Sequence, residues 1–403
     1  MNAPTELPAS AREHALLSAS GHYRWIACPP SARLEEALPA TTSTYAEEGK
    51  LAHEMAKLEL LRYLHRIPAI QYTDAWTGFR ADKRVTEDFK AALLRYVQFA
   101  ISRIEYARSV NRDAIVLVEE RVDYSAFVEE GFGTVDLLLL YDGVLESIDL
   151  KFGKGRVVKA EQNPQMKLYA LGALDRYGFL YGTERVVLTI HQPRIDEDPS
   201  SWETTTEDLL AWAEEIAPRA VLAYAGQGDF TPGEHCGYCR ANATCRARAD
   251  ANAELVQREF VLPHLLSDDE IAGLLGKLDA VIKWAGDVKT YARQQACAGR
   301  KFAGWKLVNG RSNRTYSDEG KVSAALVAAG YDEAIIYQPP APRKLLGITE
   351  MEKTLTKKMF ATLLGSLITK PPGALTLVPQ NDPREEADQS GGFDEIPTEE
   401  SDE

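Results

Sequence analysis

Residues 132–152 read FGTVDLLLLYDGVLESIDLKF, and this stretch predicts a tight β-hairpin. Residues 132–141 form a leucine-rich and β-branched run, and residues 144–152 form a second run of strand character. Between them, Asp142-Gly143 is a strong signal for a two-residue hairpin turn. The sequence therefore predicts two adjacent antiparallel strands at the centre of the fold.

Two carboxylates and a lysine lie on this predicted hairpin. Asp136 is on the first strand and Asp149 on the second, where the two carboxylates can converge on one hard cation. Lys151 is expected on the same face as Asp149, because strand side chains alternate with period two. Oxygen ligands suit Mg²⁺ or Mn²⁺, and an ammonium group can orient a water and offset phosphate charge. A hairpin with ordinary surface charges is the alternative; against it, both aspartates lie in apolar runs, where an unpaired acid is costly.

The composition fits a globular protein of two or three domains. The chain has 403 residues, of which 45% are hydrophobic and 26% charged. No run approaches the roughly 18 apolar residues of a membrane span, and the first residues lack the pattern of a signal peptide. A cytoplasmic location is expected.

The net charge of −14 argues at first against a nucleic-acid partner, but its distribution weakens that argument. Residues 382–403 carry ten acids against one arginine, which leaves about −5 for the rest and predicts a disordered acidic tail. Basic residues cluster locally and can hold phosphates, although a solvated face is an equal alternative for any one cluster. The clusters are Lys151, Lys154, Arg156, Lys159 and Lys167; Arg240, Arg246 and Arg248; and Lys301, Lys306, Arg311 and Arg314.

Hydrophobic periodicity predicts an α/β fold with a mixed sheet flanked by helices. Residues 15–37 look helical with an interruption near Cys28-Pro29-Pro30. The core elements then follow in the order α-β-β-β-α-β. They are helices at 45–64 and 87–109, strands at 115–124, 132–141 and 144–152, a helix at 163–177, a strand at 185–191 and a further helix at 206–224.

A composition shift after the cysteine-rich segment predicts a separate C-terminal unit. Residues 267–297 carry two helical patterns, and residues 304–316 predict a hairpin around Asn309-Gly310. Helices are expected within 344–369, in a small, basic α+β unit. The predicted domains are a flexible N-terminus at 1–12, a main domain at 13–255, a C-terminal domain at 256–380 and the acidic tail at 381–403.

Further polar residues accompany the acidic pair. His53 lies on the helix at 45–64, and its imidazole is a competent third metal ligand, although a single helical histidine is more often structural. Gln165 and Tyr169 are four positions apart, so they are neighbours on one face of the helix that follows Asp149. An ordinary amphipathic helix is the alternative for this last pair.

The cysteines form a second pattern. Cys236, Cys239 and Cys245 have the spacing C-x2-C-x5-C, and a fourth thiolate can come from Cys28. In a cytosolic chain this number of cysteines favours metal over disulfides, and the spacing suits zinc or an iron–sulfur cluster about equally. Cys297, in an Ala-rich helical segment, is expected to be a buried apolar residue instead.

These motifs resemble, in their order, those of the RecB-like group of PD-(D/E)xK nucleases. The group has a helical His, a G-x-x-D, a D/E-x-K and a Q-x-x-x-Y, which correspond here to His53, Gly133 to Asp136, Asp149 to Lys151, and Gln165 to Tyr169. Its restriction-endonuclease-like core has the same α-β-β-β-α-β order. Over residues 15–250, the resemblance therefore implies a metal-dependent nuclease.

The resemblance also implies roles for individual residues. His53, Asp136 and Asp149 would bind the divalent metal, with the backbone carbonyl of Leu150 as a further ligand, and Lys151 would position or activate the attacking water. Gln165 and Tyr169 would support the site and contact the nucleic-acid backbone. Glu119 and Glu120 resemble an acidic position of the group, and the sequence leaves open which of them matches it; a charge on an edge strand is the simpler interpretation.

The cysteine distribution is similar to that of Cas4- and AddB-type nucleases, with one cysteine before the nuclease core and three after it. This similarity implies a [4Fe–4S] cluster that joins the ends of the domain, held by Cys28, Cys236, Cys239 and Cys245, with zinc as the alternative.

The chain also resembles the phage and prophage DUF2800 family over residues 10–380. The resemblance rests on residues 149–155, residues 163–172 and residues 304–314. It implies a recombination exonuclease in a bacterial host, working beside a phage single-strand annealing protein. Lys154, Arg311 and Arg314 are expected to contact DNA, and the aromatic and cations of residues 305–314 suit stacking and phosphate contact, with a plain packing hairpin as an equal alternative.

The sequence thus predicts a Mg²⁺- or Mn²⁺-dependent deoxyribonuclease, most simply an exonuclease. The alternatives are a non-catalytic DNA-binding or scaffold protein that keeps the fold, and a zinc-stapled structure-specific endonuclease. A motor is not expected, because Gly276-Lys277-Leu278 lacks the hydroxyl that a phosphate-binding loop needs.

Overall fold

The computed structural model describes residues 15–39, 44–196, 198–258, 268–310, 312–332, 336–338, 344–371 and 373–387. The chain forms two compact units, Met1–Trp284 and Ala285–Glu403, and the division runs through the long helix α9 (Asp268–Cys297). No helix in the described ranges is long and apolar enough to cross a membrane.

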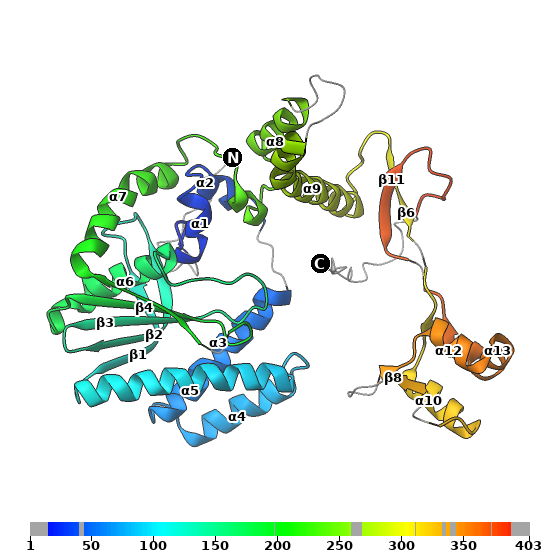
Figure 1. Cartoon of the computed structure of the whole chain (residues 1–403), viewed down its shortest axis with the longest axis horizontal. Helices are drawn as coiled ribbons and strands as arrows, with labels where there is room; N and C mark the ends of the chain where they lie inside the picture. Colours follow the sequence, from blue (N-terminus) through cyan, green and yellow to red (C-terminus); the bar gives the residue numbers. More distant parts are fainter. Residues whose placement is uncertain are drawn as a thin grey trace, which may run out of the picture. The chain divides into compact units, whose positions relative to one another are not determined.

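A five-stranded mixed sheet organises the first unit (Figure 1). Its strands lie side by side in sequence order, and every neighbouring pair is antiparallel except β3 and β4, which are parallel. The strands are β1 (Ile115–Asp123), β2 (Phe132–Tyr141), β3 (Val144–Leu150), β4 (Arg185–His191) and β5 (Ser200–Thr205). The predicted mixed sheet is confirmed.

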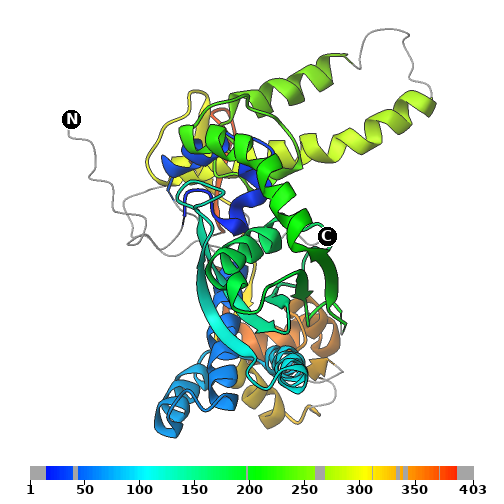
Figure 2. The ribbon, with the colours of Figure 1, turned by 90° about the vertical axis from the view of Figure 1, so that its left-hand side faces the viewer.

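Helices cover both faces of this sheet, as the two views show (Figures 1 and 2). One layer contains α3 (Thr44–Tyr63), α4 (Ala69–Arg80) and α5 (Glu87–Val110). The other contains α6 (Pro164–Tyr177) and α7 (Thr206–Ala225), with the short α1 (His22–Trp25) and α2 (Ser31–Glu36) beside α7. The predicted helix over residues 15–37 is therefore divided into short segments, which begin with η2 (Ala19–Gly21).

Strand β2 is buried on both sides, which explains its run of leucines. Leu138 and Leu140 pack into the core beneath α6 and α7, whereas Leu137 and Leu139 pack against α3 and α5. All four side chains have no exposed surface. Such double burial is typical of a central strand with helices on both faces.

Local sequence signals fix the ends of the elements around the sheet. The hairpin turn forms as predicted, with Asp142 and Gly143 both at positive φ, as a two-residue turn requires. The side chain of Thr86 caps α5, and Asn163 caps α6, which begins with Pro164. These caps set where α5 and α6 start relative to the strands.

The cysteine-rich segment follows α7. It contains the turn η4 (Glu234–Tyr238) and leads into α8 (Arg246–Arg258). A further turn, η3 (Gly178–Leu180), connects α6 to β4.

The second unit is a small α+β assembly. Helices α10 (Glu319–Ala328), α12 (Ile348–Leu355) and α13 (Lys357–Leu364) surround a core that includes Val322, Met351 and Phe360. Within the described part of this unit, three antiparallel pairs of short strands accompany the helices. They are β6 (Trp305–Asn309) with β11 (Leu375–Pro379), β7 (Thr315–Tyr316) with β10 (Ile368–Thr369), and β8 (Tyr337–Gln338) with β9 (Lys344–Leu345); η5 (Gly365–Leu367) precedes β10.

The predicted hairpin at residues 304–316 is wrong. Gly310 does not turn the chain back, because its amide donates to the carbonyl of Ala374 at 2.9 Å and β6 pairs with β11. A Cβ at Gly310 would lie 2.6 Å from that carbonyl oxygen, so this glycine serves a close backbone approach. The two helical patterns at residues 267–297 likewise form one helix, α9.

Candidate metal centre

Three elements bring potential metal ligands together beside the middle of β1 and β2. His53 on α3, Glu119 on β1 and Asp136 on β2 each offer an atom, and these atoms lie within 4.8 Å of one another. His53 Nδ1 is 3.0 Å from Asp136 Oδ1 and 4.0 Å from Glu119 Oε1. An imidazole and two carboxylates therefore share one small volume.

The position of Glu119 depends on a change of phase in β1. Val116 and Val118 pack on the α3–α5 side, so simple alternation would put Glu120 on that side as well. Instead, Glu120 bonds to Arg176 and Tyr177 of α6, and Glu119 faces His53.

The backbone at Glu119 accounts for this change. Its φ is +53°, a left-handed conformation that costs a non-glycine residue about 1–3 kcal/mol. The register is the same on both sides, with Val118 opposite Leu137 and Glu120 opposite Val135, so Glu119 lies opposite Asp136 where the pairing is interrupted. The sequence comparison left open which of the two glutamates matches the acidic position. In the structure, Glu119 lies with His53 and Asp136.

Strand β2 changes phase at the same level. Val135 and Leu138 belong to the same core, on the α6 side, although they are an odd number of positions apart. Asp136 lies at this irregularity and is 9% exposed. Its Oδ2 accepts a hydrogen bond from the amide of Leu150 at 2.6 Å. The structure thus assigns the Leu150 amide a partner, and the metal-binding role of the Leu150 carbonyl stays a prediction.

Asp149 approaches the centre from the α6 side and is 3% exposed. Its Oδ1 accepts a hydrogen bond from Gln165 Nε2 at 3.3 Å, and its Oδ2 is 2.9 Å from Lys151 Nζ. Among the described residues, Asp149 is not part of the compact trio of His53, Glu119 and Asp136. Asp149 and Lys151 therefore lie on the same side of the strand, as their spacing of two residues predicts.

Gln165 and Tyr169 support Asp149 as neighbours on α6. Gln165 Nε2 also donates to the hydroxyl of Tyr169 at 3.0 Å. The ring of Tyr169 lies against Gly133, where a Cβ would be 2.6 Å from Tyr169 Cε1. The glycine of the G-x-x-D motif therefore makes room for the aromatic ring.

The centre holds more negative charge than its cations balance. Burial and the nearby Asp136 raise the pKa of Glu119 to about 7, and burial raises the pKa of Asp149 although Lys151 opposes this shift. Burial acts against the charged form of His53, but the charge and the hydrogen bond of Asp136, together with the charges of Asp149 and Glu119, raise the His53 pKa to about 9. A donor set of carboxylates and one imidazole in this field fits a divalent cation such as Mg²⁺ or Mn²⁺.

Two of the predicted DNA-contact residues, Lys154 and Arg314, form ion pairs with acidic residues that are not part of the metal centre. Lys154 Nζ is 3.0 Å from Asp88 Oδ2, and both side chains are exposed. Arg314, in the second unit, is 2.7 Å from Glu352 Oε1. Arg311 lies outside the described residues.

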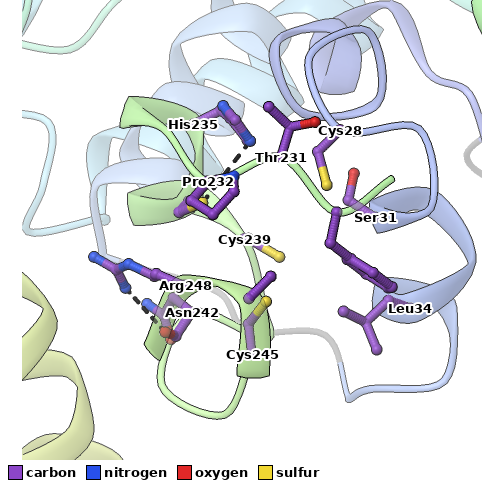
Figure 3. A pocket seen from close by; sticks show the side chains of 13 residues that line it. Cys28, Ser31, Leu34, Thr231, Pro232, His235, Cys239, Asn242, Cys245 and Arg248 are labelled. Carbon is purple, nitrogen blue, oxygen red and sulfur yellow. Dashed lines mark hydrogen bonds between the residues drawn. The ribbon is translucent and has the colours of Figure 1, made fainter. Parts of the chain in front are cut away.

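The four predicted cluster cysteines line one hollow (Figure 3). Cys28 comes from the segment between α1 and α2, whereas Cys236, Cys239 and Cys245 come from the segment around η4. The sulfurs of Cys28, Cys239 and Cys245 point towards the hollow, and Cys236 Sγ lies 3.8 Å from His235 Nε2. Among the described residues, no three potential ligand atoms that include a cysteine sulfur lie within 4.8 Å of one another. The geometry of a metal cluster is therefore not evident at these cysteines.

Burial favours the protonated form of two of these thiols, Cys28 and Cys239. Burial raises the pKa of Cys28, and it raises the pKa of Cys239 to about 11. All five cysteines are unpaired, and Cys297 is half-buried on α9. Metal binding would therefore have to displace protons from these thiols.

Comparison with models of protein families shows the family of this chain. A family model described as "Protein of unknown function (DUF2800)" matches residues 14–385. The chain belongs to the DUF2800 family. The family match includes the sheet, the cysteine segment and residues 285–385 of the second unit of this DUF2800 protein.

A solved structure titled "Crystal structure of SSO0001" is also similar to the DUF2800 chain. It is 14% identical, and the match covers 50% of this chain and 98% of that one, with a TM-score of 0.23. A likeness of this size supports no argument about the site.

Proposed function

We propose that this chain is a Mg²⁺- or Mn²⁺-dependent deoxyribonuclease with a PD-(D/E)xK core. The observation that carries the proposal is the approach of His53, Glu119 and Asp136 beside the ion pair of Asp149 and Lys151. The α-β-β-β-α-β order of the sheet and the order of the motifs support it.

The residues of the centre have distinct roles in this proposal. His53, Glu119 and Asp136 would hold the cation, with Asp149 next to them. The cation would supply Lewis-acid stabilisation of the negative charge that develops on the phosphate oxygens. The Leu150 amide and Gln165 fix the orientation of the two aspartates through hydrogen bonds.

Lys151 would act on water and phosphate. Its ammonium group is 2.9 Å from Asp149, so it is held where it can orient a water for attack. Hydrolysis forms a bond from the water oxygen to phosphorus and breaks the bond from phosphorus to the leaving sugar oxygen, which takes up a proton. Positioning the water in line is the contribution that the chain itself makes.

We further propose that the enzyme is an exonuclease that processes DNA ends in phage recombination, with a single-strand annealing protein as its partner. This part rests on the sequence resemblance. We also propose that Cys28, Cys236, Cys239 and Cys245 hold a [4Fe–4S] cluster, with zinc as the alternative; their shared hollow supports a soft metal site.

Digestion of DNA by the purified chain tests the function. End-labelled linear DNA and covalently closed circular DNA are incubated with Mg²⁺ or Mn²⁺ and with Asp149→Asn as the control. Cleavage of the linear form alone by the wild type, and none by the variant, supports an exonuclease. Cutting of the closed circle indicates an endonuclease, and equal digestion by the variant refutes the site.

A further inference from the structure

Two exposed tyrosines from distant parts of the sequence meet where α1 contacts η4. Tyr23 of α1 is 37% exposed, and Tyr238 of η4 is 56% exposed. Their ring centroids are 6.1 Å apart at an interplanar angle of 77°, an edge contact that leaves part of each ring open to solvent. Apolar surface that is exposed as a group, and not singly, indicates a site of interaction.

The pair is fixed from within the protein. The ring of Tyr23 makes a second edge contact, at 6.2 Å, with His235, which is buried and lines the cysteine hollow (Figure 3). The Tyr23 hydroxyl donates to Glu234 Oε2 at 3.3 Å. A ring held in this way loses little freedom when it binds a ligand.

Two cationic side chains accompany the tyrosines. Lys283 Nζ is 5.3 Å from the centre of the Tyr238 ring. The side chain of Arg156 is 66% exposed and lies 3.4 Å from Glu234 Oε2, the same oxygen that Tyr23 contacts. We call Tyr23, Tyr238, Arg156 and Lys283 the platform. It combines exposed aromatic surface with two positive charges, beside one carboxylate.

The segment that follows Lys151 links the platform to the proposed site. The amide of Lys151 donates to the carbonyl of His191 at 2.9 Å. The next residue, Gln192, donates through its side chain to the carbonyl of Arg156 at 3.1 Å and accepts from the amide of Val158 at 2.6 Å. Five residues span at most about 18 Å, so the backbone of Arg156 is near that of Lys151.

Exposed aromatic rings with cations beside them fit single-stranded nucleic acid. Unpaired bases stack on such rings, and lysine and arginine bind the phosphates. In a duplex the bases stack on one another, and they must leave that stack before a side chain can cover them. The platform therefore suits a single strand better than a duplex.

We propose that the platform binds unpaired bases of single-stranded DNA and directs the strand to the metal centre. Tyr23 and Tyr238 stack with the bases, and Arg156 and Lys283 contact the phosphates. Glu234 limits the affinity, because its carboxylate repels phosphate and pairs with Arg156. This inference rests on the proposed function, since it names single-stranded DNA as the substrate of that nuclease.

Tyr238 and Glu234 should have opposite effects on DNA binding. Tyr238→Ala removes a stacking ring and should weaken the binding of an oligothymidine strand by at least about fivefold. Tyr238→Phe keeps the ring and should bind like the wild type. Glu234→Gln removes the repelling charge and leaves Arg156 to the phosphates, so it should strengthen binding by about two- to fivefold.

The matched control is Tyr106→Ala on α5. Tyr106 is 50% exposed, makes an edge contact with Tyr141 at 6.1 Å and has the guanidinium of Arg103 4.6 Å from its ring centre. It therefore has the same kinds of neighbour, but it lies beside the end of β2 that leads into the hairpin turn. This variant should bind DNA like the wild type.

The test is fluorescence anisotropy of labelled oligothymidine and of a blunt duplex of the same length, on the full chain with Ca²⁺ in place of Mn²⁺. Thermal unfolding checks that each variant is folded. Preference for the single strand that is lost in Tyr238→Ala, kept in Tyr238→Phe and Tyr106→Ala, and increased in Glu234→Gln supports the proposal. Equal binding of strand and duplex by the wild type, or an unchanged affinity in Tyr238→Ala, overturns it.

A parallel cleavage assay in Mn²⁺ separates this inference from the function on which it rests. Absence of cleavage by the wild type refutes the proposed nuclease, whatever the anisotropy shows. Cleavage by the wild type together with an unchanged affinity in Tyr238→Ala refutes the platform alone.

Discussion

Glu119 lies opposite Asp136 across β1 and β2, at the point where side-chain alternation changes phase in both strands. The left-handed backbone of Glu119 turns its carboxylate towards His53, and the adjacent Glu120 is turned towards α6. Backbone strain at such a position is a reason to look for function there.

This relationship predicts different effects for the two glutamates. Glu119→Gln removes a proposed ligand and should weaken Mn²⁺ binding by at least about tenfold. Glu120→Gln should leave that affinity unchanged and cost about 0–1 kcal/mol, because it loses only a partly exposed ion pair with Arg176. Isothermal titration with Mn²⁺ compares them, and equal losses in the two variants would show that the assignment of Glu119 is wrong.

The stability of the metal-free protein should fall as the pH rises. The Glu119 pKa of about 7 is above its ordinary value of 4.5, so this contribution is complete below pH 4.5 and is lost as the pH rises through 7. The His53 contribution has the same sign: it is complete below pH 6.5 and is lost as the pH rises through 9.

Thermal unfolding in chelator, at pH values from about 5 to about 9, checks this expectation. The difference between wild type and Glu119→Gln isolates the carboxyl contribution, and it should shrink as the pH rises through 7. A wild-type stability that increases relative to the variant over this range would contradict the proposed charge balance.

Gly133→Ala should disturb the support of Asp149. The new Cβ would lie 2.6 Å from Tyr169 Cε1, which forces the ring and its partner Gln165 to move. We expect a loss of about 1–3 kcal/mol in unfolding free energy and slower cleavage.

Gly49→Ala is the matched control on α3. Its Cβ would meet nothing within 4 Å, so a helical alanine there should raise stability by about 1 kcal/mol and leave cleavage intact. Chemical denaturation and cleavage assays on both variants decide the matter. Normal cleavage by Gly133→Ala would remove the argument that Tyr169 supports the site.

The cysteine hollow predicts bound metal in protein purified without oxygen. A cluster would give iron and acid-labile sulfide in equal amounts, and Cys239→Ser should lose them together with thermal stability. Cys297→Ser changes a thiol outside the hollow and should keep the metal. Zinc alone would favour the zinc alternative, and the absence of both metals from the wild type would refute a metal site there.

Much of the sheet could be predicted because its residues are buried in a regular pattern. The leucines of β2 and the Asp142-Gly143 turn indicated the hairpin, and the motifs of α3 and α6 indicated its neighbours. Two elements gave no such signal. Helix α4 buries none of its residues, and β5 is a short edge strand with Trp202 as its one large apolar residue.

The arrangement of the site could be predicted only where side chains alternate regularly along the strands. Period-two alternation brings Asp149 and Lys151 together, and the structure has them 2.9 Å apart. The same rule would select Glu120 over Glu119, because no feature of the sequence reveals a positive φ at a glutamate. Similarly, Asn309-Gly310 has the composition of a turn, but its partner strand lies far along the chain at residues 375–379.

The central claim is that the centre of His53, Glu119 and Asp136 binds the cation that cleavage requires. The most direct test measures cleavage of linear DNA against Mn²⁺ concentration for the wild type and Asp136→Asn. We predict saturable, metal-dependent cleavage by the wild type and none by the variant, with both proteins folded. Cleavage by the wild type in excess chelator, or an unchanged Mn²⁺ dependence in Asp136→Asn, would contradict the account.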